Sequence, residues 1–113
     1  YLKVSDIIRS CEIYKNKAAI AKYYGDEDNN VFIAQAADTL VDIKGISAAF
    51  VVFKNKNNIL ISARSNGTVN VQVIMEKLGG GGHQLIAGAQ LTEGTVDKTI
   101  VTIKELLDEL EEI

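Results

Sequence analysis

The 113-residue sequence contains no proline and no tryptophan, and it has only one cysteine and one histidine. The single cysteine, Cys11, has no partner for a disulfide within the chain, which favours a reducing compartment. No apolar run approaches the roughly 18 residues that a membrane-spanning helix requires, and no secretory signal peptide is present. We therefore expect a cytoplasmic domain. Because the chain begins at Tyr1 without a methionine, we expect it to be one domain of a longer protein.

The sequence also lacks an excess of positive charge. Its 12 Lys and Arg residues stand against 15 Asp and Glu residues, which gives a net charge of −3 and a pI near 5.1. Binding to duplex DNA depends on many contacts from Lys and Arg to phosphates, so we expect no duplex DNA as a partner, while a local basic pocket stays open. A hydrophobic content of 47% over this length is sufficient for one globular domain.

Side chains that carry chemistry are scarce in the sequence. A zinc centre usually takes about three or four protein ligands, and the chain offers one histidine, one cysteine and dispersed carboxylates. No set of nucleophile, base and orienting residue is recognisable either. We therefore expect no metal site, no cofactor and no catalytic residue in this chain.

The spacing of apolar residues predicts an alternation of strands and helices. Strands are expected over 17–24, 46–55, 58–65 and 86–91, helices over 31–45, 71–78 and 95–113, and a short helix or linker over 5–14. The second and third strands form a hairpin. Asn70 caps the helix over 71–78, and Gly79 ends it. We expect a single α/β domain, bordering on α+β, with a mixed sheet of about four to five strands flanked by helices.

The segment 25–30, Gly-Asp-Glu-Asp-Asn-Asn, consists of residues that favour turns. Its acidic side chains fit either a cation site or a solvated loop before the helix at 31–45. We favour the solvated loop, because carboxylates before a helix also interact favourably with its dipole.

Four consecutive glycines, 79–82, precede the single histidine, His83. Gly79 alone suffices to end a helix, so the other three need a further reason, since glycine is costly to order. Glycine-rich turns present successive backbone N–H groups to anions, but the sequence matches neither the P-loop nor the dinucleotide-binding fingerprint. Two interpretations stay open: a different phosphate-binding loop that includes His83, or a purely structural turn.

Arg64 is the second candidate for phosphate binding. In the strand over 58–65, Leu60, Ser62 and Arg64 share one face, and the alternate apolar residues share the other. Arg64 is either a solvated charge at a strand end or a ligand for an anion, because the guanidinium fork matches phosphate geometry. If the strand and the following helix fold back on each other, Arg64 and the glycine segment converge on one anion.

These residues together form a pattern that is more specific than any of its parts. It comprises Ser62, Arg64 and Ser65 in a Ser-x-Arg-Ser stretch, Asn70 and Val71 at a helix start, Gly80 to His83 as Gly-Gly-Gly-His, and Ala87 and Gly88 after it. The pattern resembles the DHHA1 domain, the C-terminal lobe of DHH-type phosphoesterases. Ile86 departs from it, since the family usually has alanine there.

Within that family, the sequence of residues 70–83 looks most like that of the cyclic-di-AMP phosphodiesterases of Gram-positive bacteria. The nano-RNA and phosphoadenosine-phosphate phosphatases are a close alternative. The resemblance implies that a DHH lobe, absent from this sequence, holds two manganese ions and cleaves a cyclic or linear dinucleotide or a short oligonucleotide. It implies that residues 1–16 are a linker or a helix from this preceding domain, and that 17–113 are the DHHA1 substrate-binding domain.

The same resemblance implies which residues bind the substrate: Gly80, Gly81, Gly82 and His83 on one phosphate, Arg64 and Ser65 on the second phosphate or the nucleotide, with Ser62 and Asn70 as additional candidates. The fragment alone is then expected to be inactive. A single-strand exonuclease or tRNA-synthetase type of lobe, and a non-catalytic interaction module, remain as alternatives. The family further implies a possible homodimer, and the subfamily a membrane-anchored parent protein.

Overall fold

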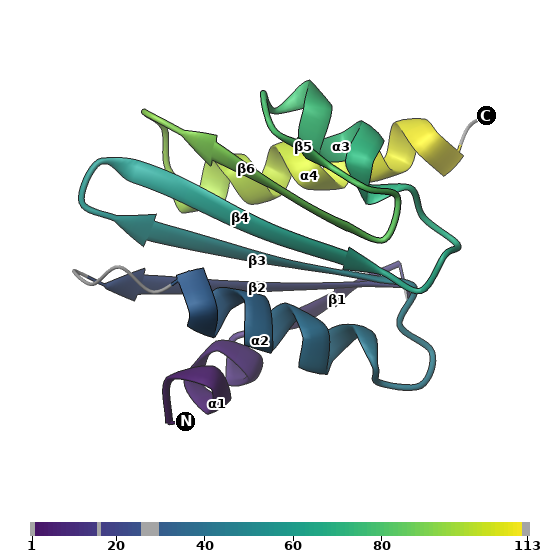
Figure 1. Cartoon of the computed structure of the whole chain (residues 1–113), viewed down its shortest axis with the longest axis horizontal. Helices are drawn as coiled ribbons and strands as arrows, with labels where there is room; N and C mark the ends of the chain where they lie inside the picture. The colour runs from purple at the N-terminus through teal and green to yellow at the C-terminus, as the bar shows by residue number, and fades with distance from the viewer. Residues whose placement is uncertain (1, 16, 26–29, 112–113) are drawn as a thin grey trace.

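A computed structural model describes residues 2–15, 17–25 and 30–111 of the chain (Figure 1). The elements in chain order are α1 (Leu2–Arg9), β1 (Glu12–Tyr14), β2 (Ala18–Gly25), α2 (Asn30–Val41), β3 (Ala48–Asn55), β4 (Asn58–Ser65), α3 (Val71–Lys77), β5 (Gly81–Gly82), β6 (Ile86–Leu91) and α4 (Val96–Glu111). Every strand and helix expected from the sequence is present, and β1 and β5 are additional. Of the turn expected at 25–30, residues 26–29 lie outside the described part of the chain.

The six strands form one mixed sheet in the order β1-β2-β3-β4-β6-β5. The pair β2 and β3 is parallel, and α2 makes the crossover between them. The other neighbouring pairs are all antiparallel. The predicted mixed α/β sheet is therefore confirmed, with six strands instead of four or five.

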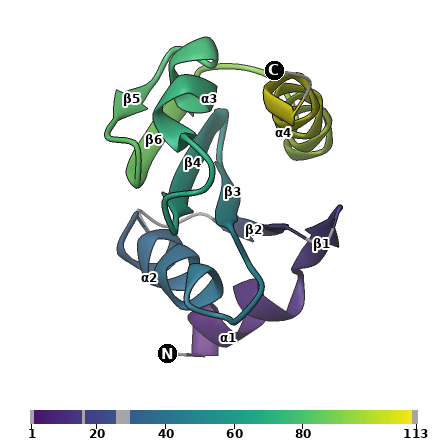
Figure 2. The ribbon, with the colours of Figure 1, turned by 90° about the vertical axis from the view of Figure 1, so that its right-hand side faces the viewer.

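Helices pack on both faces of the sheet (Figure 2). On one face, α1 and α2 cover a core that includes Ile33 and Leu40 of α2. On the other face, α3 and α4 cover a second core that includes Ile74 and Ile103. Fully burying one such side chain contributes roughly 1.5–3 kcal/mol, so the two cores fix both helix layers against the sheet.

Residues 2–14, expected to be a helix or a linker, pack onto this sheet. The side chain of Ile7 is fully buried beneath α2, and β1 pairs with β2 along its whole length. Ser10 adds a further connection to β2, because its hydroxyl accepts a hydrogen bond of 2.9 Å from the amide of Lys22. That this segment leads from a preceding DHH domain stays a prediction.

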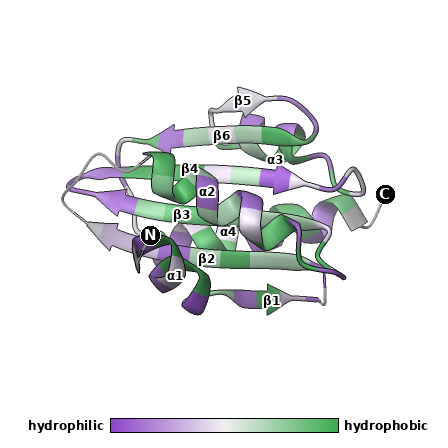
Figure 3. Ribbon diagram, turned by 60° about the horizontal axis from the view of Figure 1, so that its bottom comes forward, coloured by the Kyte–Doolittle hydropathy of each residue, from purple (hydrophilic) through white to green (hydrophobic). Residues whose placement is uncertain are grey.

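The sheet extends further than the helices on its α2 face. Helix α2 packs mainly on β3 and β4, and none of the described helices lies over β6 and β5 on this side (Figure 3). Helix α3 supports the same two strands from the opposite face. The outer part of the sheet is thus covered on one side only.

The glycine segment brings β5 against β6 backbone to backbone. Gly79 ends α3 with a φ of +86°, as predicted, and the Gly80 amide donates to Met75 O at 2.8 Å. A side chain at Gly80 would overlap the carbonyl oxygen of Gly88, and one at Gly82 would come within 2.6 Å of a backbone carbon of β6. Gly80 and Gly82 are therefore required by the approach of β6. Gly81 faces open space, because a Cβ atom added there would meet none of the described residues within 4 Å beyond its chain neighbours.

A group of charged residues joins β1 to α4. The Asp108 carboxylate accepts hydrogen bonds of 2.9 Å from the hydroxyl of Tyr14 and pairs with Lys15 Nζ at 2.7 Å. Lys104 pairs with Glu12 at 3.1 Å. The hydrogen bond from Lys15, and then that from Tyr14, lower the pKa of Asp108 below its ordinary value of 3.8.

We expect Gly80→Ala to lower the free energy of unfolding by about 1–3 kcal/mol, because the methyl group has no room against β6. Gly81→Ala is the matched control, and we expect it to stay within about 0.5 kcal/mol of the parent. Urea denaturation of both variants measures the difference. Equal stabilities for the two variants would contradict the packing described for Gly80.

Because the folded-state pKa of Asp108 is lowered, its stabilisation is present above the unfolded-state pKa and is lost as the pH falls through the folded-state pKa. NMR titration of the carboxyl carbons should place Asp108 below 3.8. The Asp108→Asn variant should lose less stability than the parent between about pH 5 and pH 2. A measured pKa at or above the ordinary value would show that the bonds to Lys15 and Tyr14 do not persist in solution.

Candidate functional site

A row of three small residues runs from β4, at the edge of α2, into the uncovered part of the sheet. Ser62 of β4 pairs with Gly88 of β6, and Gly88 pairs with Gly81 of β5, so the three positions lie side by side across three strands. Paired residues point to the same face, and Ser62 lies on the α2 face. With neighbouring strands about 4.8 Å apart, this row makes a nearly flat floor about 10 Å wide.

We call this surface the trough. Its floor is Ser62, Gly88 and Gly81. A hollow at this place is lined by Ser62 and Gly88 of the floor and by Gly80, Leu60, Gln90 and Ile33. Leu60 and Gln90 are themselves paired, two residues along the strands from the floor. The trough therefore combines exposed backbone with apolar side chains and one amide side chain.

Arg64 lies at one end of the trough, in the next row on the same face. It is paired with Ile86 of β6, whose side chain is exposed. The Arg64 side chain is only 13% exposed, and its Nε donates to Asp38 Oδ1 of α2 at 2.6 Å. The interpretation of Arg64 as a solvated charge is therefore wrong, because it is largely covered and paired with a carboxylate.

The glycine segment lies on the far side of Ile86 from Arg64. The amide of Gly80 donates to Met75, and the amide of His83 donates to Ile86 O at 2.6 Å. These two N–H groups serve the fold. Residues 83 and 86 form a hydrogen-bonded pair of the antiparallel ladder, so the pair of Gly81 and Gly88, two residues along, does so as well. An anion at this segment would therefore be bound through the amide of Gly82 or the imidazole. His83 itself is exposed and lines a hollow with Gln84 and Leu85 at the turn into β6.

Ser65, a further candidate, lies on the opposite face from Arg64. Successive strand residues alternate between faces, and Ser65 is buried on the side of α3. Its hydroxyl accepts a hydrogen bond of 3.0 Å from the amide of Gly67, and its amide donates to Leu85 O. The structure therefore does not bring Arg64 and Ser65 to one surface.

Asn70 caps α3, as the sequence predicts. Its side-chain oxygen accepts hydrogen bonds of 3.0 Å from the amide of Gln72 and 3.3 Å from that of Val73. The cap fixes the start of the helix that supports β5 and β6. Of the eight candidate residues, Ser62, Arg64 and Gly81 share the trough face, whereas Ser65 and Asn70 hold the loop between β4 and α3.

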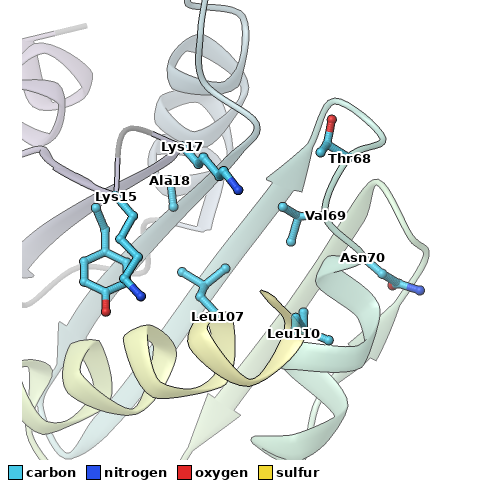
Figure 4. A pocket seen from close by; sticks show the side chains of 9 residues that line it. Lys15, Lys17, Ala18, Thr68, Val69, Asn70, Leu107 and Leu110 are labelled. Carbon is cyan, nitrogen blue, oxygen red and sulfur yellow. The ribbon is translucent and has the colours of Figure 1, made fainter. Parts of the chain in front are cut away.

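A second cavity, of about 300 Å³, lies between the C-terminal part of α4 and the loop before α3. Figure 4 shows Ala18, Val69 and Leu107 around it, while the polar ends of Thr68 and Asn70 point away. Lys15, at its edge, pairs with Asp108. The walls are thus mainly apolar, with polar groups of Tyr14, Lys15 and Lys17 at one side.

Asp38 is the residue at this site that sequence reasoning missed. It follows Ala36 and Ala37, which α2 packs onto the sheet, and it reaches a strand residue 26 positions away. A carboxylate on the polar side of a helix carries no local signal of such a partner. Its position near the trough therefore emerges only from the packing of α2 on β4.

In residues 2–15, 17–25 and 30–111, no group of three or more His, Cys, Asp and Glu side chains is arranged to hold a metal ion. The described helices also include none with the length and apolarity needed to cross a membrane. The expected metals of a separate domain stay a prediction.

Comparison with known proteins identifies one family along nearly the whole chain. The DHHA1 domain family matches residues 16–112. The chain is 46% identical over 111 residues to the cyclic-di-AMP phosphodiesterase GdpP of Geobacillus thermodenitrificans, covering 95% of this chain and 17% of that protein. It is 48% identical over 94 residues to the cyclic-di-AMP phosphodiesterase PdeA of Listeria monocytogenes, covering 81% of this chain and 14% of that protein.

The fold also matches a solved structure. An exopolyphosphatase-related protein from Bacteroides fragilis superposes with a TM-score of 0.83 at 17% sequence identity, covering 96% of this chain and 34% of that one. The architecture is thus shared well beyond recognisable sequence identity. The chain spans less than a fifth of the length of the two curated relatives.

We expect Asn70→Ala to lower the free energy of unfolding by about 1 kcal/mol, because two amides of α3 lose their acceptor. Asn70→Asp keeps an acceptor at the same position and should stay within about 0.5 kcal/mol of the parent. Urea denaturation measures both. If the alanine variant were as stable as the parent, the cap would not contribute to holding α3.

Proposed function

The chain belongs to the DHHA1 domain family, and from this membership we propose that it is the substrate-binding part of a phosphodiesterase that hydrolyses cyclic di-AMP. Two relatives above 45% identity are named for that activity. The cleaving chemistry would then belong to a DHH domain of the same protein, which would hold two manganese ions to supply the activation of water. The described residues of this chain do not form a metal-ligand cluster, so their part is to bind and orient the nucleotide.

The observation that carries the proposal is the trough. Its floor has a serine in β4 at the edge of α2 and two glycines in β6 and β5, and none of the described helices lies over these two outer strands on this face. A flat floor without bulky side chains lets a ligand approach the backbone closely. The floor is bordered by Arg64, whose guanidinium supplies a cation for a phosphodiester. His83 lies at the adjacent turn, where its imidazole can donate a hydrogen bond to a phosphate.

The proposed binding mode uses the two ends of this surface differently. Arg64 and His83 flank Ile86, since Arg64 pairs with Ile86 across β4 and β6 and the His83 amide bonds to Ile86 O. Two strand spacings separate them, about 10 Å, which favours a ligand with two phosphates over a single anion. The nucleotide then lies along the trough toward Leu60 and Gln90.

Three further features rest on the same membership. We infer that residues 1–16 connect to the preceding DHH domain and that the uncovered sheet face closes against that domain when the substrate is bound. Homodimerisation and membrane attachment of the parent protein are proposed from the resemblance alone. A linear dinucleotide or a short oligonucleotide is the alternative substrate.

We expect His83→Ala in the full-length protein to lower kcat/KM for cyclic di-AMP by about tenfold or more, because a hydrogen bond to a charged phosphate is lost. Gly81→Val should be at least as harmful, because its side chain enters the trough from a position with open space. Steady-state kinetics with cyclic di-AMP and with linear di-AMP measures both effects.

Two controls accompany this experiment. Thermal unfolding should be nearly unchanged in Gly81→Val, since Gly81 has no positive φ and a Cβ there has no close neighbour among the described residues. Lys54 lies near the end of β3 away from the residue that pairs with Arg64. Lys54→Ala should therefore leave kcat and KM unchanged. If both His83→Ala and Gly81→Val kept the parent kcat and KM, the glycine segment would be structural only and the proposal would fail.

A further inference from the structure

Arg64 is held by a specific partner on another element. Its Nε donates to Asp38 Oδ1 at 2.6 Å, and its Nη1 donates to the carbonyl oxygen of Ala63 at 3.0 Å. The Arg64 side chain is 13% exposed, whereas Asp38 is 62% exposed. The guanidinium is therefore fixed from the side of α2 by a carboxylate that remains in contact with solvent.

The two hydrogen bonds leave part of the guanidinium available. A guanidinium has five N–H donors, and the contacts with Asp38 and Ala63 use one on Nε and one on Nη1. Among the described residues, no hydrogen bond is formed by Nη2. One N–H on Nη1 and both on Nη2 thus remain for a ligand, and these make the edge with which arginine binds phosphate through two parallel bonds.

From this arrangement we propose that Asp38 is a positioning residue for substrate binding: it orients Arg64 so that the Nη1–Nη2 edge is held ready for a substrate phosphate at the end of the trough. The inference rests on the proposed function. A carboxylate that competed with phosphate would occupy that same edge, whereas Asp38 contacts Nε through one oxygen.

The rigid placement of Asp38 supports this role. Ala36 and Ala37, just before it on α2, are fully buried against the sheet, and Leu40 after it is buried as well. The Asp38 backbone is therefore fixed relative to β4, and its short side chain reaches Arg64 directly. Binding groups keep their geometry best when their supports lie on packed elements of this kind.

The test is a double-mutant cycle in the full-length protein with cyclic di-AMP as substrate. Asp38→Ala should raise KM about tenfold, the effect of one hydrogen bond to a charged group, and leave kcat within about twofold. Asp38→Asn keeps an oxygen that accepts from Nε and should have a smaller effect. The exposed Asp42, just past the end of α2, supplies the control Asp42→Ala, which should leave KM unchanged.

The coupling with Arg64 decides the outcome. Arg64→Ala should raise KM on its own, and adding Asp38→Ala to it should cause no further rise. A full additional increase in the Arg64→Ala background, or a lower KM in Asp38→Ala, would overturn the positioning role while leaving the proposed function intact. If Arg64→Ala kept the parent KM, the phosphate contact of Arg64 would fail, and this inference with it.

Thermal unfolding separates positioning from mere stability. Asp38→Ala removes an ion pair between α2 and β4, so its melting temperature is measured beside that of Asp38→Asn. A KM effect that persists at temperatures where both variants are fully folded supports positioning. A KM effect that appears only as the variant begins to unfold would overturn it.

Discussion

The arrangement of this domain depends on one close contact, in which the backbone of Gly80 and Gly82 lies directly against that of β6. Any side chain at these two positions would meet the neighbouring backbone, so the contact exists only because both are glycine. The contact adds β5 to the sheet and brings Gly81 into line with Gly88 and Ser62. The flat floor of the trough follows from it, and so does the place of His83 at the turn that comes next.

The second determinant is the alternation of side chains along β4. Arg64 faces α2 and Ser65 faces α3, so two neighbouring residues with polar side chains serve different purposes. Ser65 holds the loop that leads to the cap of α3. Helix α3 in turn supports β5 and β6 from the face opposite α2. The structural and the proposed binding roles of this short stretch are therefore linked, because a shift in the loop would also displace the strands that form the trough.

Much of this could be predicted from the sequence, because its signals are local. The cap at Asn70, the stop at Gly79 and the apolar spacing of the helices each depend on residues within one or two turns. The strands β1 and β5 were not predicted, since one has three residues and the other consists of two glycines, which have low strand propensity. The glycine segment suggested a ligand, but Gly80 and Gly82 are glycine because the backbone of β6 lies against them. The local sequence pattern does not reveal this contact. The pair of Arg64 and Asp38 is likewise set by packing between distant segments.

The strand order also affects how the sheet avoids association with other chains. Its most apolar strand, β3 with the run Ala-Ala-Phe-Val-Val-Phe, lies in the interior between β2 and β4. The two edges are formed by β1 and β5, which are the shortest strands of the sheet. Short edges offer few unpaired backbone groups to a second sheet, which is a known protection against edge-to-edge aggregation. The glycine strand that completes the trough therefore also leaves little template for amyloid-like growth at that border.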